Sequence, residues 1–143
     1  MARLIALFIV FLAALVTAAP LGTRAGLGSI KCNIDRFKIV TSLAATNAAV
    51  KQIDTSSSDT AAAVGTAQTG LSSAADGIKT IALNIITGQS PSAAARTQVQ
   101  NGLNDAQTAL TGINDSTAGA TVAAAQSKLA ATIQDGDDVV ADC

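Results

Sequence analysis

Four stretches of the chain place apolar residues at alternating spacings of three and four, which is the period of one face of an α-helix. The first stretch runs from about residue 34 to residue 53, with Phe37 and Val40 beside its main stripe. The stripe consists of Ile39, Leu43, Thr46, Val50 and Ile53. A polar run follows, and Ser58 or Asp59 there is suited to cap a second helix, because its side-chain oxygen can accept from unpaired backbone amides.

The second stretch has the most regular stripe, over about three heptads, which keeps one seam facing a partner helix. Its members are Val64, Ala67, Leu71, Ala74, Ile78, Ile81 and Ile85. Single glycines at 65, 70 and 77 lie off this stripe, and each costs up to about 1 kcal/mol relative to alanine in a helix. We therefore expect this helix to depend on packing for its stability. Gly88 suits the left-handed position that follows a helix end.

Two further stripes follow along the chain. Ser90 and Pro91 form an N-cap and first-turn pair for the third helix, and the segment 112–117 is the next turn. The third stripe is Val99, Leu103, Ala106, Leu110 and Ile113. The fourth stripe is Ala118, Val122, Ala125, Leu129 and Ile133, followed by Val140. Because the seams are rich in alanine, we expect close helix approach and little room for a large pocket.

Four helices of about 20 to 28 residues joined by short turns predict an all-α fold, an up-down-up-down four-helix bundle. In this topology the start of the first helix and the end of the fourth lie at the same end of the bundle. Cys32 and Cys143, the two cysteines of the chain, stand at these two points. We expect one disulfide between them, which an oxidising compartment permits. An intermolecular disulfide is the alternative.

Residues 1–18 have the pattern of a secretory signal peptide, with Arg3 before an apolar run and small residues before the cleavage point. The apolar run is shorter than the roughly 20 residues that span a bilayer. We expect residues 19–31 to form a flexible leader and residues 32–143 to form the bundle domain. The predicted protein is secreted, and is extracellular or associated with a cell wall.

The composition removes the usual groups of catalysis and of nucleic-acid binding. The chain has no His, Trp or Tyr, and Phe37 is the one aromatic residue outside the signal peptide. A nucleophile then lacks its usual base, so we expect no enzyme activity. Two cysteines without histidine cannot complete a zinc site. Neither a basic patch nor a stacking platform is present for nucleic acid.

The chain ends in an acidic segment that carries Asp135, Asp137, Asp138 and Asp142. An EF-hand calcium loop needs a glutamate at its last position, and this chain contains no glutamate. We therefore interpret the segment as a solvated helix end and expect no metal and no cofactor. Because a helix dipole disfavours anions at its C-terminus, we expect this end to fray or to be held by another group.

Asn114 begins an N-glycosylation sequon, Asn-Asp-Ser, in the turn predicted between the third and fourth helices. The position in a turn favours exposure, which a glycosylated asparagine requires. Asn114 is therefore a candidate modification site.

The segment KCNIDRFKIVTSLAATNAAVKQI, together with the signal peptide and the Ala/Thr-rich helical stretches, resembles the hydrophobic surface-binding protein (cell-wall galactomannoprotein) family of filamentous fungi. The resemblance covers about residues 34–140 and rests on size, secretion, helix layout and composition. It implies a secreted protein that adsorbs to hydrophobic surfaces, but it supplies no motif from which binding residues can be assigned.

The apolar helix faces are the candidate binding residues. Their ordinary role is to form the bundle core, but the same stripes can be buried against a hydrophobic surface or a lipid. We therefore expect a non-enzymatic protein that binds such a surface. The alternatives are an effector or inhibitor that binds another secreted or host protein, and a structural glycoprotein of the cell wall.

Overall fold

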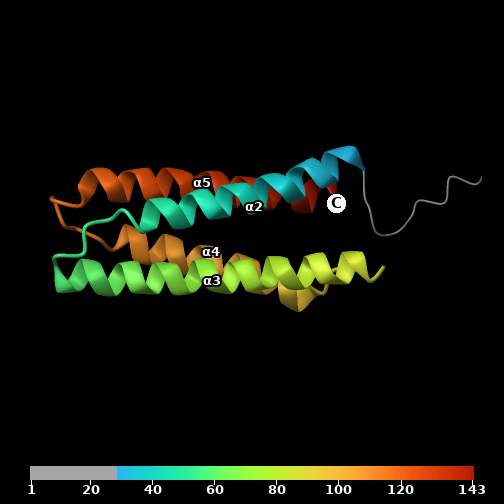
Figure 1. The fold of residues 1–143 in the computed structure, drawn as a ribbon, viewed down its shortest axis with the longest axis horizontal. Coiled ribbons are helices and arrows are strands. Elements are labelled where there is room, and N and C mark those ends of the chain that lie inside the picture. The colour runs from blue at the N-terminus through green and yellow to red at the C-terminus, as the bar shows by residue number, and fades with distance from the viewer. Residues whose placement is uncertain (1–28) are drawn as a thin grey trace, which may run out of the picture.

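The computed structural model describes residues 29–143. Over this range the chain forms four helices and no strand, packed as a bundle (Figure 1). The helices are α2 (Ile30–Val50), α3 (Ser58–Ile86), α4 (Ala93–Thr111) and α5 (Gly119–Asp142). The prediction of an all-α four-helix bundle is confirmed. The predicted signal peptide lies outside the described residues, as does the predicted leader up to residue 28.

The four helices form two closely packed antiparallel pairs. One pair is α2 with α5 and the other is α3 with α4, while α2 meets α3, and α4 meets α5, over a much smaller area (Figure 1). The loops 51–57 and 112–118 lie together at one end, here called the loop end. The start of α2 and the end of α5 lie at the opposite end, here called the disulfide end, together with the turn from α3 to α4.

Serine side chains cap two of the four helices. Ser29 caps α2 by accepting from the amide of Cys32 at 3.1 Å, so α2 begins a few residues before the predicted start. Ser92 caps α4 by accepting from the amide of Ala95 at 3.2 Å. The prediction of Ser90 as this cap was wrong by two residues.

The α3 helix begins without a side-chain cap. Ser57 stands at the cap position, but its hydroxyl accepts no hydrogen bond from the first backbone amides of the helix. Ser58 and Asp59, the predicted caps, are already the first residues of the helix. After α3, Gly88 has a φ of 75°, so the prediction of a left-handed glycine at this turn is confirmed.

The predicted stripes form one continuous core, which runs through all four helices. Eleven of the predicted large apolar residues are buried: Ile39, Leu43, Val50, Ile53, Val64, Leu71, Val99, Leu103, Leu110, Val122 and Leu129. Ile78, Ile81 and Ile133 are partly buried against this core, and Ile85 is half-buried. These side chains therefore serve the core, and are not free to bind a surface while the bundle is closed.

One buried polar contact crosses the core between α2 and α5. The hydroxyls of Thr46 and Thr132 lie 2.9 Å apart, and both side chains are fully buried. The Thr132 hydroxyl also donates to the carbonyl of Lys128 at 3.1 Å. Since its single hydrogen is used there, the Thr46 hydroxyl must donate to Thr132. Both hydroxyls are thereby satisfied inside the core.

Glycines bring the backbones of α3 and α4 into direct contact. A methyl group on Gly70 would lie 2.5 Å from the carbonyl oxygen of Gly102, and one on Gly77 would lie 2.9 Å from that of Ala95. The prediction that Gly70 and Gly77 lie off the packed seam was wrong, because both are buried against α4. Gly65, with open space around it, does lie off the seam.

Candidate apolar surface at the disulfide end

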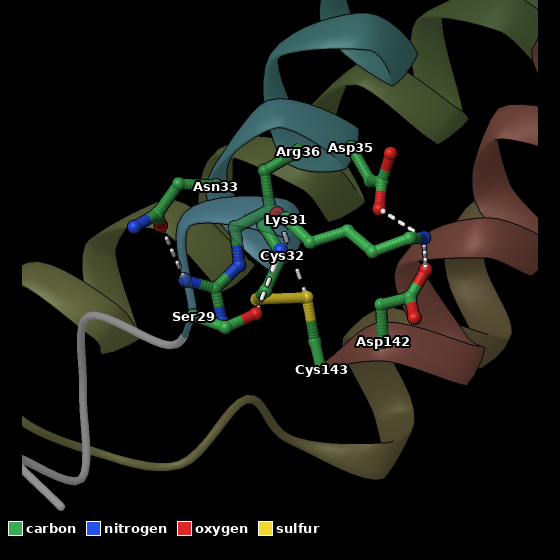
Figure 2. The surroundings of a disulfide bond; sticks show 8 residues. All are labelled: Ser29, Lys31, Cys32, Asn33, Asp35, Arg36, Asp142 and Cys143. Carbon is green, nitrogen blue, oxygen red and sulfur yellow. Dashed lines mark hydrogen bonds and ion pairs between the residues drawn. A yellow bond between two sulfur atoms is a disulfide. The ribbon is translucent and has the colours of Figure 1, made fainter.

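The disulfide joins Cys32, near the start of α2, to Cys143, just after α5 (Figure 2). The two Cα atoms are 5.2 Å apart, which is an ordinary disulfide spacing. Cys32 is buried, and Cys143 is exposed. The prediction of one intramolecular disulfide that joins the first and last helices at one end of the bundle is confirmed.

An ion-pair cluster lies beside the disulfide. The ammonium group of Lys31 lies between the carboxylates of Asp35 and Asp142, so it connects α2 to the last turn of α5 (Figure 2). Asp35 is only 1% exposed and also pairs with Lys38 at 2.9 Å. Together with the disulfide, the Lys31–Asp142 pair holds the acidic end of α5 in place, as expected for an end that is not stabilised by its own helix dipole.

The cluster shifts the ionisation of its members toward the charged forms. The hydrogen bond from Lys38, and secondarily that from Lys31, lowers the pKa of Asp35 against the opposing effect of its burial. The hydrogen bond to Asp142 raises the pKa of Lys31. The hydrogen bond to Asp35 raises the pKa of Lys38, with smaller contributions from the charges of Asp138 and Asp135. The acidic tail therefore lies in the field of the basic residues of α2.

The acidic tail has a structural role in this arrangement. Asp135, Asp138 and Asp142 are half-buried, while Asp137 is exposed. Within residues 29–143, no group of three acidic or cysteine side chains lies close enough together to hold a metal ion. What the described tail does is complement Lys31 and Lys38 across the α2–α5 contact.

The large apolar side chains that remain exposed gather in the half of the bundle nearer the disulfide. They lie on the first half of α2, the last turn of α3 and the end of α5, while the loop end of the described chain has none. This set is called the apolar surface below; its members are Ile30, Ile34, Phe37, Val40, Leu83, Ile86 and Val140. Ile30, Ile34 and Phe37 follow a four-three spacing, so they share one face of α2.

This α2 face points away from the bundle core. Phe37 is 69% exposed and Ile30 is 81% exposed, whereas Ile39, two residues from Phe37, is buried against the core. The exposed face of α2 is thus apolar in the same half of the helix in which the buried face carries Cys32, Asp35 and Ile39. An isolated exposed apolar residue is ordinary in soluble proteins, whereas here seven large ones lie in the same half of the described bundle.

A groove of about 480 Å³ lies between α2 and α3, beside the apolar surface. Its apolar walls are formed by Val40, Leu43 and Ala44 of α2 and by Leu71, Ala75 and Ile78 of α3. Its polar lining residues are Asn47, Gln68, Ser72 and Lys79. This volume lies within the range of small-molecule sites, about 300 to 1,000 Å³. The contact between α2 and α3 thus leaves an open groove at the surface, whereas α3 and α4 approach closely.

The sequence contained a signal for the apolar surface. Phe37 and Val40 lie beside the first stripe, and Leu83 and Ile86 lie off the second stripe, so one core face cannot bury them. Ile30 was missed as a surface residue because the helix was expected to begin at about residue 34, and Ile34, at that expected start, was assigned to no face. The candidate binding residues thus divide into a mostly buried set, the predicted stripes, and an exposed set that lies off the stripes except for Val140. The prediction that Val140 continues the fourth stripe was wrong, because its side chain is 72% exposed near the end of α5.

Asn114 lies on the loop between α4 and α5, at the loop end, and is exposed. It is therefore far from the apolar surface along the bundle axis (Figure 1). The glycosylation sequon and the apolar surface thus lie toward opposite ends of the described bundle.

Comparison of the chain with protein-family models, with curated proteins and with solved structures finds no match. Within residues 29–143, no helix has both the length and the apolar character needed to cross a membrane. The function must therefore be argued from the arrangement of the described residues.

Proposed function

We propose that the protein is a secreted, non-enzymatic protein that adsorbs to hydrophobic or lipid surfaces through its disulfide end. One observation carries this proposal: the exposed large apolar side chains of the described chain all lie in that half of the bundle. The resemblance to the hydrophobic surface-binding protein family supports the same function. The groove between α2 and α3 offers further apolar area next to this surface.

The energetics favour adsorption by the closed bundle. Burying one exposed Ile, Leu or Phe side chain is worth about 1.5 to 3 kcal/mol, so a few such residues suffice for a measurable affinity. Exposing the buried stripes instead would give up the core contacts of residues such as Leu110 and Leu129. The apolar surface needs no such rearrangement, because Phe37 and Ile86 are already exposed.

Adsorption isotherms on alkylated and bare silica test the proposal. The wild-type bundle should adsorb strongly to alkylated silica and weakly to bare silica. The double variant Phe37→Ser/Ile86→Ser should bind alkylated silica at least about tenfold more weakly, since each tenfold corresponds to about 1.4 kcal/mol. Both residues are exposed, so the variant should unfold at nearly the same denaturant concentration as the wild type.

The matched control places two serines at the loop end. Ala62 and Ala120 are exposed on the first turns of α3 and α5, and Ala62→Ser/Ala120→Ser should adsorb as the wild type does. Equal adsorption of the wild type on both kinds of silica would contradict the proposal. Equal loss of adsorption in the two double variants would contradict the assignment to the disulfide end.

A further inference from the structure

The loop between α4 and α5 presents the single N-glycosylation sequon of the chain. The other asparagines, such as Asn104, lack a Ser or Thr two positions later. Both Asn114 and Ser116 are exposed in the structure. We propose that Asn114 carries an N-linked oligosaccharide, an inference that rests on the secretion included in the proposed function.

The loop is built so that the two side chains of the sequon face solvent. Asp115, between them, is half-buried and fastens the loop to the bundle: its carboxylate accepts from the amide of Thr117 at 2.9 Å and from the hydroxyl of Thr60 on α3 at 3.2 Å. Asp115 thus contacts the bundle, whereas Asn114 and Ser116 on either side of it are exposed. The Asn114 amide and the Ser116 hydroxyl are the two groups that define the sequon.

The Asn114 side chain can react without disturbing the core. Its Nδ2 donates one hydrogen bond, to the carbonyl of Gly112 at 3.2 Å within the same loop. No helix depends on this bond, because α4 already ends at Thr111. An oligosaccharide on Nδ2 extends into solvent at the loop end, so it displaces none of the buried side chains.

The donor in this reaction is an oligosaccharide carried on a lipid diphosphate. Nδ2 of Asn114 attacks the anomeric carbon of the sugar, and a carbon–nitrogen bond forms. The bond between that carbon and the diphosphate oxygen breaks, and its electron pair leaves with the lipid diphosphate. Nδ2 gives up one proton to solvent, and no group is oxidised or reduced.

Secretion of the full chain from cultured eukaryotic cells tests the site. Intact mass is measured for the medium and the cell extract, before and after treatment with a peptide-N-glycosidase, which hydrolyses the side-chain amide bond, releases the whole N-linked oligosaccharide and leaves aspartate. The wild type should lose the mass of one oligosaccharide and gain the small mass change that converts Asn114 to aspartate. Asn114→Gln and Ser116→Ala should show no loss of mass.

Two variants serve as matched controls. Ser116→Thr keeps the hydroxyl and should keep the oligosaccharide, and Asn104→Gln changes an exposed asparagine outside the sequon and should also keep it. Wild-type protein in the medium without sugar would overturn the site but leave secretion and adsorption standing. Wild-type protein retained in the cells without sugar would overturn both the site and the secretion on which it rests. Sugar on Asn114→Gln would overturn the assignment to this residue.

Discussion

Asp35 is the one charged side chain buried among residues 29–143. A buried carboxylate without partners would be costly, and here two lysines of the same helix compensate it, Lys38 at 2.9 Å and Lys31 at 3.3 Å. Lys31 in turn reaches Asp142 of α5. A single residue near the start of α2 therefore organises the charges that face the end of α5.

The stability that Asp35 contributes should depend on pH. Its pKa is lowered in the folded protein by the hydrogen bonds from Lys38 and Lys31. Its contribution is therefore fully present above its unfolded pKa, about 3.9, and is lost as the pH falls through the lower folded pKa. Denaturant unfolding should show Asp35→Asn to be less stable than the wild type at pH 7, with the difference shrinking toward about pH 2.

The comparison isolates Asp35 because other acids remain in both proteins. The pKa of Asp54 and that of Asp115 are also lowered, by hydrogen bonds from Ser56 and Thr117 respectively. Their contributions cancel in the difference between wild type and variant. A difference that stays constant from neutral to acidic pH would show that the ion pairs of Asp35 do not stabilise the fold.

At the scale of elements, the two helix pairs are held by different means. The α3–α4 pair is held by close backbone approach at Gly70, Gly77 and Gly102. The α2–α5 pair is held by the disulfide, the Lys31–Asp142 ion pair and the buried threonine contact. Between the pairs, α2 and α3 leave the groove. The bundle thus consists of two tight layers that meet more loosely.

Two glycine substitutions on these helices should have opposite effects. A methyl group on Gly102 would collide with the backbone of Gly70 and Ala74, so Gly102→Ala should lower the free energy of unfolding by about 1 to 3 kcal/mol. Gly65 lies on exposed helix surface with nothing within 4 Å of a new methyl, so Gly65→Ala should raise it by up to about 1 kcal/mol.

Urea unfolding of the two variants and the wild type measures both effects. Gly65→Ala makes the same chemical change in the neighbouring helix, so it controls for the gain in helix propensity. If both variants were stabilised, the backbones of α3 and α4 would lie farther apart in solution than in the structure.

The sequence predicted the four helices and the disulfide, but it did not predict which helices pack closely against each other. The three-four stripes identify core positions such as Leu71 and Leu110 because burial of one face imposes that period. The same period does not determine against which of the other three helices the residues on each side of a stripe pack. Gly70 and Gly77 were therefore placed outside the seam, although they form the contact with α4.

The candidate site was less predictable for a related reason. The three-four spacing identifies residues that a bundle buries. Phe37, Leu83 and Ile86 belong to the candidate surface because the bundle leaves them exposed. They lie outside the stripes that face the core, and which of the residues outside the stripes stay exposed is decided by how the four helices pack. Asn114, by contrast, lies in a turn that the sequence already indicated, and its exposure follows from that position.

At the scale of the whole molecule, the two ends of the bundle differ in character. The disulfide end carries the apolar surface, and the loop end carries polar loops and Asn114. An elongated molecule with this division should adsorb with the disulfide end toward the surface and the loop end in water. Lysine acylation can detect this orientation, because Lys51 at the loop end and Lys79 in the groove between α2 and α3 are both exposed.

In solution, Lys51 and Lys79 should both react with a water-soluble acylating reagent. On alkylated silica, the acylation of Lys79 should fall several-fold while that of Lys51 stays the same, as measured by peptide mass spectrometry after elution. Equal protection of both lysines would indicate adsorption without a preferred orientation.

The Cys32–Cys143 bond closes the chain between these two residues into a covalent loop. All four helices lie within the segment that the bond spans, apart from the first residues of α2. A single peptide-bond cleavage in any of the three inter-helix connections therefore leaves both fragments in one molecule, joined through sulfur. Such a nicked protein keeps its helices side by side at a high effective concentration, and it separates into two pieces only when the disulfide is reduced and the bundle unfolds.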